Sequence, residues 1–397
     1  MQKKELTKPM VKCLTMLLGL FVMVNTSNAQ QSENSFKIGG AVRFNLMNKS
    51  WVENKTQPEM TWDTWRLNVD GSQGGIDFSF EYRFYPTFDT HFIHHGYLGY
   101  GLSDDLYMKL GVVQVPFGIS KFASHSWWFQ GQYYFGLEDD YDMGIKFDYA
   151  GIDKLDLNFA YFRQAEPEGP SAGGVTYGNA GAGRYSYDIT PGSVMIDGET
   201  VQASIRELNQ FNLRAAYHLS QALEVGASAQ VGGIYNSIHN ESEWSTAVAA
   251  HLVADWGKGW NFKGSWISHN YKAKADDGRV LDIVPMGAYG SSYGVMAKAN
   301  TYAAGIAKTV KTDFGPIKSL QFYVDYTYVD KTKADFEDMQ HLVPGVLISA
   351  GPVYTYVDYA MGKNQPWLNS SFGKGLGAGD PNAEWNKRFN VNIGYYF

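Results

Sequence analysis

The chain has 397 residues and a formal net charge of −7, with 43 Gly, 27 Tyr, 23 Phe and 11 Trp. The acidic balance argues against nucleic acid as a partner. No uninterrupted apolar stretch of ~18 residues lies beyond the first 29 residues, so we expect no transmembrane helix. Many aromatic and glycine residues without long apolar runs fit strands that are apolar on one face only.

The first 29 residues read as a secretory signal peptide. Lys3, Lys4, Lys8 and Lys12 precede the apolar run CLTMLLGLFVMV, and the small residues up to Ala29 follow. This order predicts export and cleavage after Ala29. Cys13 lies at the start of the apolar run, so a lipid anchor is not expected, and the remaining domain, 30–397, has no cysteine for a disulfide.

Segments of alternating polarity then follow one another along the chain. In IDFSFEYRF, 76–84, five apolar residues face one side, and Asp77, Glu81 and Arg83 face the other. Charges in a packed core would be very costly, whereas a water-filled interior tolerates them. We count roughly fifteen or sixteen such strands of about 10 residues, and single-chain bacterial barrels favour even numbers. The sequence therefore predicts an all-β protein: a transmembrane antiparallel barrel of about 16 strands.

The predicted connections come in two lengths. Short turns at 70–75, 103–105 and 150–154 alternate with long loops at 115–140, 164–206, 271–291 and 362–387. Short turns at one end and long external loops at the other are typical of outer-membrane barrels.

The strand DDLYMKLGVVQVPFGIS, 104–120, runs directly into a Pro-Phe-Gly turn. It resembles the phosphate-selective porin O and P family of outer-membrane porins, in which such a strand leads into a loop that folds inward and narrows the channel. The resemblance implies a sixteen-stranded, trimeric channel for small anions. The chain departs from the family pattern at Gln114, where a basic residue is usual, and at Ser120, where an acidic residue often follows the turn.

Strand alternation predicts which side chains line the channel. They carry both signs of charge: Lys37, Arg43, Arg66, Asp77, Glu81, Arg83, Lys109, Lys146 and Arg214. Strong phosphate selectivity would need a ladder of positive charges. The mixture therefore favours a general-diffusion porin for small hydrophilic solutes over a dedicated phosphate channel.

The predicted constriction loop is rich in aromatic residues. Pro116, Phe117, Gly118 and Lys121 begin it, and Trp127 and Trp128 belong to an aromatic run that ends at Gly136. These rings could stack on sugars, which would make the protein an oligosaccharide channel. Packing of the rings against the barrel wall or in an interfacial girdle is the preferred interpretation.

Other motifs are weaker evidence for a functional site. His91 and His95 share one face of a strand and His94 the other, so a solvated pair is expected in place of a metal site. The acidic run at 137–142 could bind Ca²⁺ or Mg²⁺, but a solvated charge run is the preferred interpretation. The glycine-rich segment 178–184 lacks a flanking strand and helix and is expected to be a loop. No nucleophile motif is present, and we expect no catalytic residue, metal or cofactor.

The last strand, RFNVNIGYYF, is apolar on the face of Phe389, Ile393, Tyr395 and Phe397. We expect it to close the barrel, and the resemblance implies that Tyr395 and Phe397 form a signal for the barrel assembly machinery. The expected partners are the outer-membrane bilayer, small solutes or anions, and two further copies in a homotrimer. A secreted β-rich adhesin or glycan-binding protein is the alternative from a different class.

Overall fold

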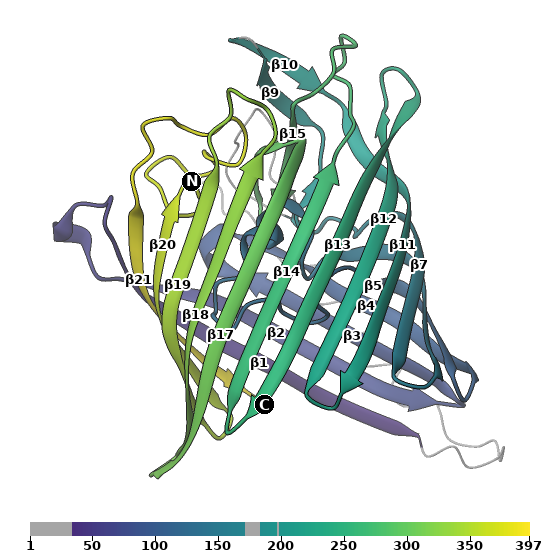
Figure 1. The fold of residues 1–397 in the computed structure, drawn as a ribbon, viewed down its shortest axis with the longest axis vertical. Coiled ribbons are helices and arrows are strands. Elements are labelled where there is room, and N and C mark those ends of the chain that lie inside the picture. The colour runs from purple at the N-terminus through teal and green to yellow at the C-terminus, as the bar shows by residue number, and fades with distance from the viewer. Residues whose placement is uncertain (1–33, 171–182, 197) are drawn as a thin grey trace, which may run out of the picture.

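The structure is a computed structural model that describes residues 34–170, 183–196 and 198–397. The predicted signal peptide and most of the segment 178–184 lie outside these residues. Sixteen antiparallel strands form a closed barrel, which confirms the predicted fold and strand number (Figure 1). In barrel order they are β1 (Ser35–Lys49), β2 (Glu59–Gln73), β3 (Ile76–Tyr85), β4 (Thr90–Ser103), β5 (Leu106–Gln114), β6 (Tyr141–Ile152), β7 (Leu155–Ala165), β11 (Ile205–Ser220), β12 (Leu223–Asn236), β13 (Glu241–Gly257), β14 (Trp260–Asn270), β17 (Lys298–Phe314), β18 (Ile317–Lys331), β19 (Met339–Ala350), β20 (Val353–Lys363) and β21 (Asn386–Tyr396).

The two ends of the barrel differ, as the loop lengths predicted. At one end tight turns join the strands, and the turn between β2 and β3 uses Gly74 and Gly75 with φ of 61° and 81°. At the other end, uppermost in Figure 1, the long loops carry two small sheets. The first contains β8 (Asp188–Ile189), β15 (Ile283–Ala288) and β16 (Ser291–Met296), and the second pairs β9 (Gly192–Ile196) with β10 (Glu199–Ala203).

Three short 3₁₀ helices complete the described structure: η2 (Asn54–Thr56), η3 (Pro86–Phe88) and η4 (Gly131–Phe135). No helix in the described ranges is long and apolar enough to cross a membrane.

The C-terminal strand closes the barrel. β21 pairs with β20 on one side and with β1 on the other. The Phe397 N–H donates to the Gly40 carbonyl at 3.1 Å, and the Gly40 N–H donates to the Phe397 carbonyl at 2.9 Å. The Phe397 side chain is 57% exposed on the outer face, in line with Ile393 and Tyr395. The expectation of a strand held to its last residue is confirmed.

Strand alternation separates an apolar outer face from a polar interior. Large apolar side chains such as Phe36, Leu98 and Phe322 are exposed outside, and polar ones such as Glu81 and Asn392 are buried inside.

One predicted alternation is wrong. The register of β3 and β4 shifts so that Glu81 pairs with His95 and Tyr82 with Ile93, which leaves His94 as an extra residue. This bulge puts the Nδ1 atoms of His94 and His95 2.9 Å apart and buries His94, so the histidines are not the expected solvated pair.

Candidate functional site

The loop 115–140 between β5 and β6 folds into the barrel, as predicted. Its base is closed by a hydrogen bond of 2.9 Å from the Val115 N–H to the Asp140 carbonyl. The turn at Pro116 and Phe117 is buried, and Gly118 follows it with φ of 61°. The Gly118 N–H donates to Ser228 Oγ on β12 at 3.0 Å. The loop therefore begins against the wall formed by β11 and β12.

The middle of the loop is fixed to β14 and β18. Lys263 Nζ donates to the carbonyls of Phe122 and Ser124 at 2.8 and 2.9 Å. Asp325 Oδ2 accepts from the backbone N–H groups of His125 and Ser126 at 2.7 and 2.8 Å, and Asp325 Oδ1 lies 2.9 Å from His125 Nδ1. Bonds to an ionised acceptor are stronger than neutral ones. The inward loop thus has specific anchors on one wall of the barrel.

The opposite wall is basic. Arg43, Arg66, Arg83 and Arg388 come from four neighbouring strands, β1, β2, β3 and β21. The first three have carboxylate neighbours: Arg43 Nε lies 2.9 Å from Asp63, Arg83 pairs with Glu81, and Arg66 Nη1 lies 3.6 Å from Glu81. Among the described residues, no carboxylate pairs with the fourth, Arg388.

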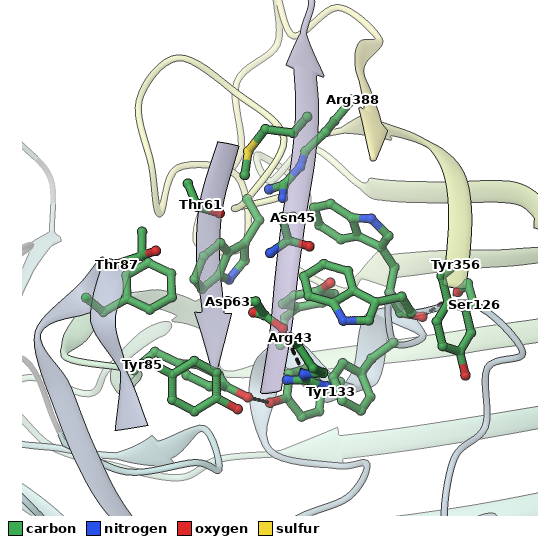
Figure 2. A pocket seen from close by; sticks show the side chains of 18 of the residues that line it. Arg43, Asn45, Thr61, Asp63, Tyr85, Thr87, Ser126, Tyr133, Tyr356 and Arg388 are labelled. Carbon is green, nitrogen blue, oxygen red and sulfur yellow. Dashed lines mark hydrogen bonds and ion pairs between the residues drawn. The ribbon is translucent and has the colours of Figure 1, made fainter. Parts of the chain in front are cut away.

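A cavity of about 630 Å³ separates this wall from the inward loop. Arg43 and Asp63 meet in its middle in Figure 2, with Arg388 and the loop residue Ser126 also facing it. Five basic and two acidic side chains line the cavity, so its lining carries an excess of positive charge. They are Arg43, Lys49, Arg66, Arg83 and Arg388, against Glu59 and Asp63.

Aromatic rings form a large part of the remaining lining. Trp127 and Trp128 of the loop line the cavity, and the Arg388 guanidinium lies 5.1 Å from the Trp128 ring centroid. Trp128 is nevertheless buried, and so are Tyr133 and Tyr134, which pack on Tyr187 from the next long loop. Packing accounts for most of the aromatic run, which agrees with the preferred interpretation of the sequence. Trp127 and Trp128 also face the cavity.

The structure brings together only some of the residues predicted to line the channel. Arg43, Arg66 and Arg83 share the cavity. Lys109 and Lys146 form a separate group on Asp148, with nitrogen-to-oxygen distances of 2.9 and 3.7 Å.

The other predicted lining residues have different surroundings. Arg214 pairs with Glu224 at 3.0 Å, and its Nε donates to the Gly118 carbonyl at 2.8 Å, so it holds the turn of the inward loop. Asp77 accepts from Tyr107 at 2.6 Å, and Glu81 lies between Arg66 and Arg83. Lys37 and Lys121 are exposed.

The acidic run at the end of the inward loop is buried, which contradicts the expected solvated charge run. Ala123 N–H donates to Glu138 at 2.9 Å, and Asp139 accepts from Gln114 and Tyr185 at 2.8 and 2.6 Å. Burial raises the pKa of Glu138 to about 8 and that of Asp139 to about 6. The prediction of a solvated run is wrong because the loop turns into the barrel, where protein atoms replace the surrounding water.

Several lining residues escaped the sequence prediction. Arg388 lies on the same face of β21 as Asn390 and Asn392, so alternation was a usable signal for it. Asp63 is the extra residue of a bulge in β2, between Trp62 and Thr64, which pair with Phe44 and Arg43, so alternation gave no signal for it. Trp367 and Tyr289 come from long loops without any periodic pattern, so no signal in the sequence placed them here.

Comparisons with known proteins add evidence on the fold. Neither the models of known families nor the curated proteins gave a match. Among solved structures, the chain is similar to an anion-selective porin from Comamonas acidovorans, with a TM-score of 0.56 and 14% identity over 92% of this chain and 100% of that one. The outer-membrane channel DcaP of Acinetobacter baumannii gives 0.55 and 12% over 94% and 100%, and Salmonella typhi OmpF in complex with daunomycin gives 0.58 and 10% over 92% and 98%. The structural neighbours are thus outer-membrane porins, and the chain has their fold.

Proposed function

We propose that this chain is an outer-membrane porin, without catalytic activity, that lets small hydrophilic solutes diffuse through a water-filled channel and favours anions. The observation that carries the proposal is the cavity between the inward loop and the arginines of β21, β1, β2 and β3. An excess of fixed positive charge around a narrow aqueous path attracts anions and repels cations.

The charge balance within the cavity supports a modest preference. Lys49 and Glu59 pair at 2.7 Å, and Arg43 and Asp63 pair at 2.9 Å, so two cations are largely compensated. Arg66 and Arg83 share Glu81, and Arg388 faces the cavity over Trp128. Inorganic phosphate is one anion of the right size. The resemblance to the phosphate-selective family makes it worth testing, although the paired charges favour general anion diffusion.

Location and assembly belong to the same proposal. The exposed apolar outer face and the strand that closes at Phe397 fit insertion into the outer membrane by the barrel assembly machinery after export. One of the neighbours, OmpT of Vibrio cholerae, is described in a trimer form. We propose a homotrimer for this chain as well.

Liposome swelling tests the proposal. Vesicles that contain the detergent-purified mature protein should swell in isosmotic solutions of small sugars and of small organic anions, and faster for anions than for cations of equal size. Vesicles that do not swell with any small solute would contradict a diffusion channel. Equal rates for anions and cations would contradict the anion preference alone.

A second candidate, an oligosaccharide channel, rests on Trp127 and Trp128 at the cavity. It predicts that maltodextrins block ion current through the protein at millimolar concentration. The absence of block by a broad panel of sugars would remove it.

A further inference from the structure

Five carboxylates gather at the base of the inward loop, away from the cavity. Asp140 directly precedes β6 and Asp142 is its second residue. Glu166 follows β7, Asp188 lies on β8 and Glu207 lies on β11. One oxygen from each of Asp140, Asp142 and Asp188 lies within 4.8 Å of the others, and all three side chains are buried. Two oxygens on opposite sides of a Ca²⁺ ion, each at 2.3–2.6 Å, are about 4.6–5.2 Å apart, so this spacing suits a shared ion.

Each carboxylate is held in place by a neighbour. Gln210 Nε2 donates to Asp142 Oδ2 at 3.1 Å, and Ile189 N–H donates to Glu207 Oε1 at 2.9 Å. Glu166 Oε1 accepts from two backbone N–H groups, those of Tyr185 and Ser186, at 3.1 and 2.8 Å. The cluster is therefore preorganised and does not depend on mobile side chains.

Two oxygens in this group have no hydrogen-bond donor within the described residues. They are Asp142 Oδ1 and Glu166 Oε2, and each side chain is only 1% exposed. A buried oxygen without a hydrogen-bond partner is costly. The two unpartnered oxygens therefore point to a bound cation.

Within the described residues, one guanidinium stands against the five carboxylates. Arg184 Nη1 lies 3.1 Å from Asp188, and Arg184 also pairs with Glu168. The cluster therefore holds more negative than positive charge, which a bound cation offsets.

We propose that Asp140, Asp142, Asp188 and Glu166 bind one Ca²⁺ ion. Ca²⁺ suits a set of carboxylate oxygens of irregular geometry, whereas Mg²⁺ demands a near-ideal octahedron and retains several waters. The ion joins the base of the inward loop to the end of β7 and to the small sheet that contains β8. Its role is to hold the inward loop against the long external loop.

Calcium binding can be measured without reference to transport. The detergent-purified mature protein is made metal-free with EDTA and titrated with CaCl₂ by calorimetry, and in parallel with Tb³⁺, whose luminescence is excited through nearby tyrosines. Tyr141 is a suitable donor, since it stands between Asp140 and Asp142 in the chain. We expect one Ca²⁺ per chain, and Ca²⁺ should displace Tb³⁺.

The variant D142N/D188N keeps the side-chain volume and removes two charges. We expect Ca²⁺ to bind it at least about tenfold more weakly, and we expect calcium to raise the unfolding temperature of the wild type but not that of the variant. The control D104N/D313N changes two exposed acidic residues and should bind like the wild type. If the double variant does not fold, E166Q serves in its place. Absence of calcium heat and Tb³⁺ luminescence with folded wild type, or wild-type affinity in the variants, would overturn the proposal.

Discussion

Asp325 on β18 is the strongest single anchor of the inward loop, and its loss should free that loop. In the variant D325A the backbone N–H groups of His125 and Ser126 lose an acceptor at 2.7 and 2.8 Å, and the His125 ring loses its partner at 2.9 Å. Hydrogen bonds to a charged group contribute about 1.5–3 kcal/mol each. Water that enters from the channel replaces part of these hydrogen bonds. We therefore expect the free energy that anchors the loop to fall by about 3–6 kcal/mol.

Such a loss raises the population of the detached loop about 10²- to 10⁴-fold. The barrel itself stays intact because its strand pairing is unchanged. Lys263 and Thr327, whose Oγ1 accepts from the Gly131 N–H at 2.8 Å, still contact the loop. Single-channel recording in a planar bilayer should then show a larger or noisier conductance than the wild type. Swelling assays should show faster entry of larger sugars.

The control is D330A, near the C-terminal end of β18. Among the described residues, no hydrogen bond joins Asp330 to the inward loop. It should conduct like the wild type. Wild-type conductance and an unchanged size limit in folded D325A would refute the reasoning that this carboxylate holds the constriction in place.

Three further predictions follow from the cavity and the barrel seam. Replacing Arg388 by Ala removes one positive charge. At about 7 Å in water, a unit charge attracts a passing anion and repels a passing cation by about 0.6 kcal/mol each. The anion-to-cation permeability ratio, measured from the reversal potential, should therefore fall about sevenfold, and an unchanged ratio would mean that Arg388 does not face the ion path. Trp128→Ala should lower the temperature at which the folded barrel loses its heat-modifiable mobility on gels, because large-to-small changes at a buried aromatic cost about 3–5 kcal/mol; an unchanged temperature would show that the ring does not pack the loop. Deleting Phe397 removes both hydrogen bonds to Gly40 and should reduce the amount of folded barrel in outer-membrane fractions; a normal yield would contradict its role in assembly.

Much of the fold could be predicted because a barrel strand has a simple period. The alternation in 76–84 placed Glu81 and Arg83 inside. The lengths of the connections placed a long loop between residues 114 and 141, and the resemblance to the porin family implied that this loop folds inward. The apolar face of the last strand predicted the seam with β1. These features depend on local sequence alone, since each strand has one face toward lipid and one toward water.

The site could be predicted only in part, because it depends on contacts between distant segments. A single bulge at His94 reversed the side of one histidine, and no local pattern reveals a bulge of this kind. The acidic run at 137–142 has the composition of a surface segment, and it is buried because the loop that contains it folds into the barrel. Its neighbour Asp188 comes from another long loop, so the carboxylate cluster exists only after folding.

Arg214 shows the same limit for a strand residue. Alternation correctly turned it inward, but only the folded loop shows that it bonds the Gly118 carbonyl and does not face open water. Periodicity predicts the side on which a residue lies, and tertiary contacts decide what it does there.

The reversal potential of single channels under a salt gradient tests the central claim most directly. Purified mature protein in a planar bilayer should give discrete conductance steps, and the reversal potential should favour anions because of the basic wall of the cavity. A reversal potential that favours cations would contradict the anion preference. Folded protein that gives no conductance steps at all would contradict the channel itself.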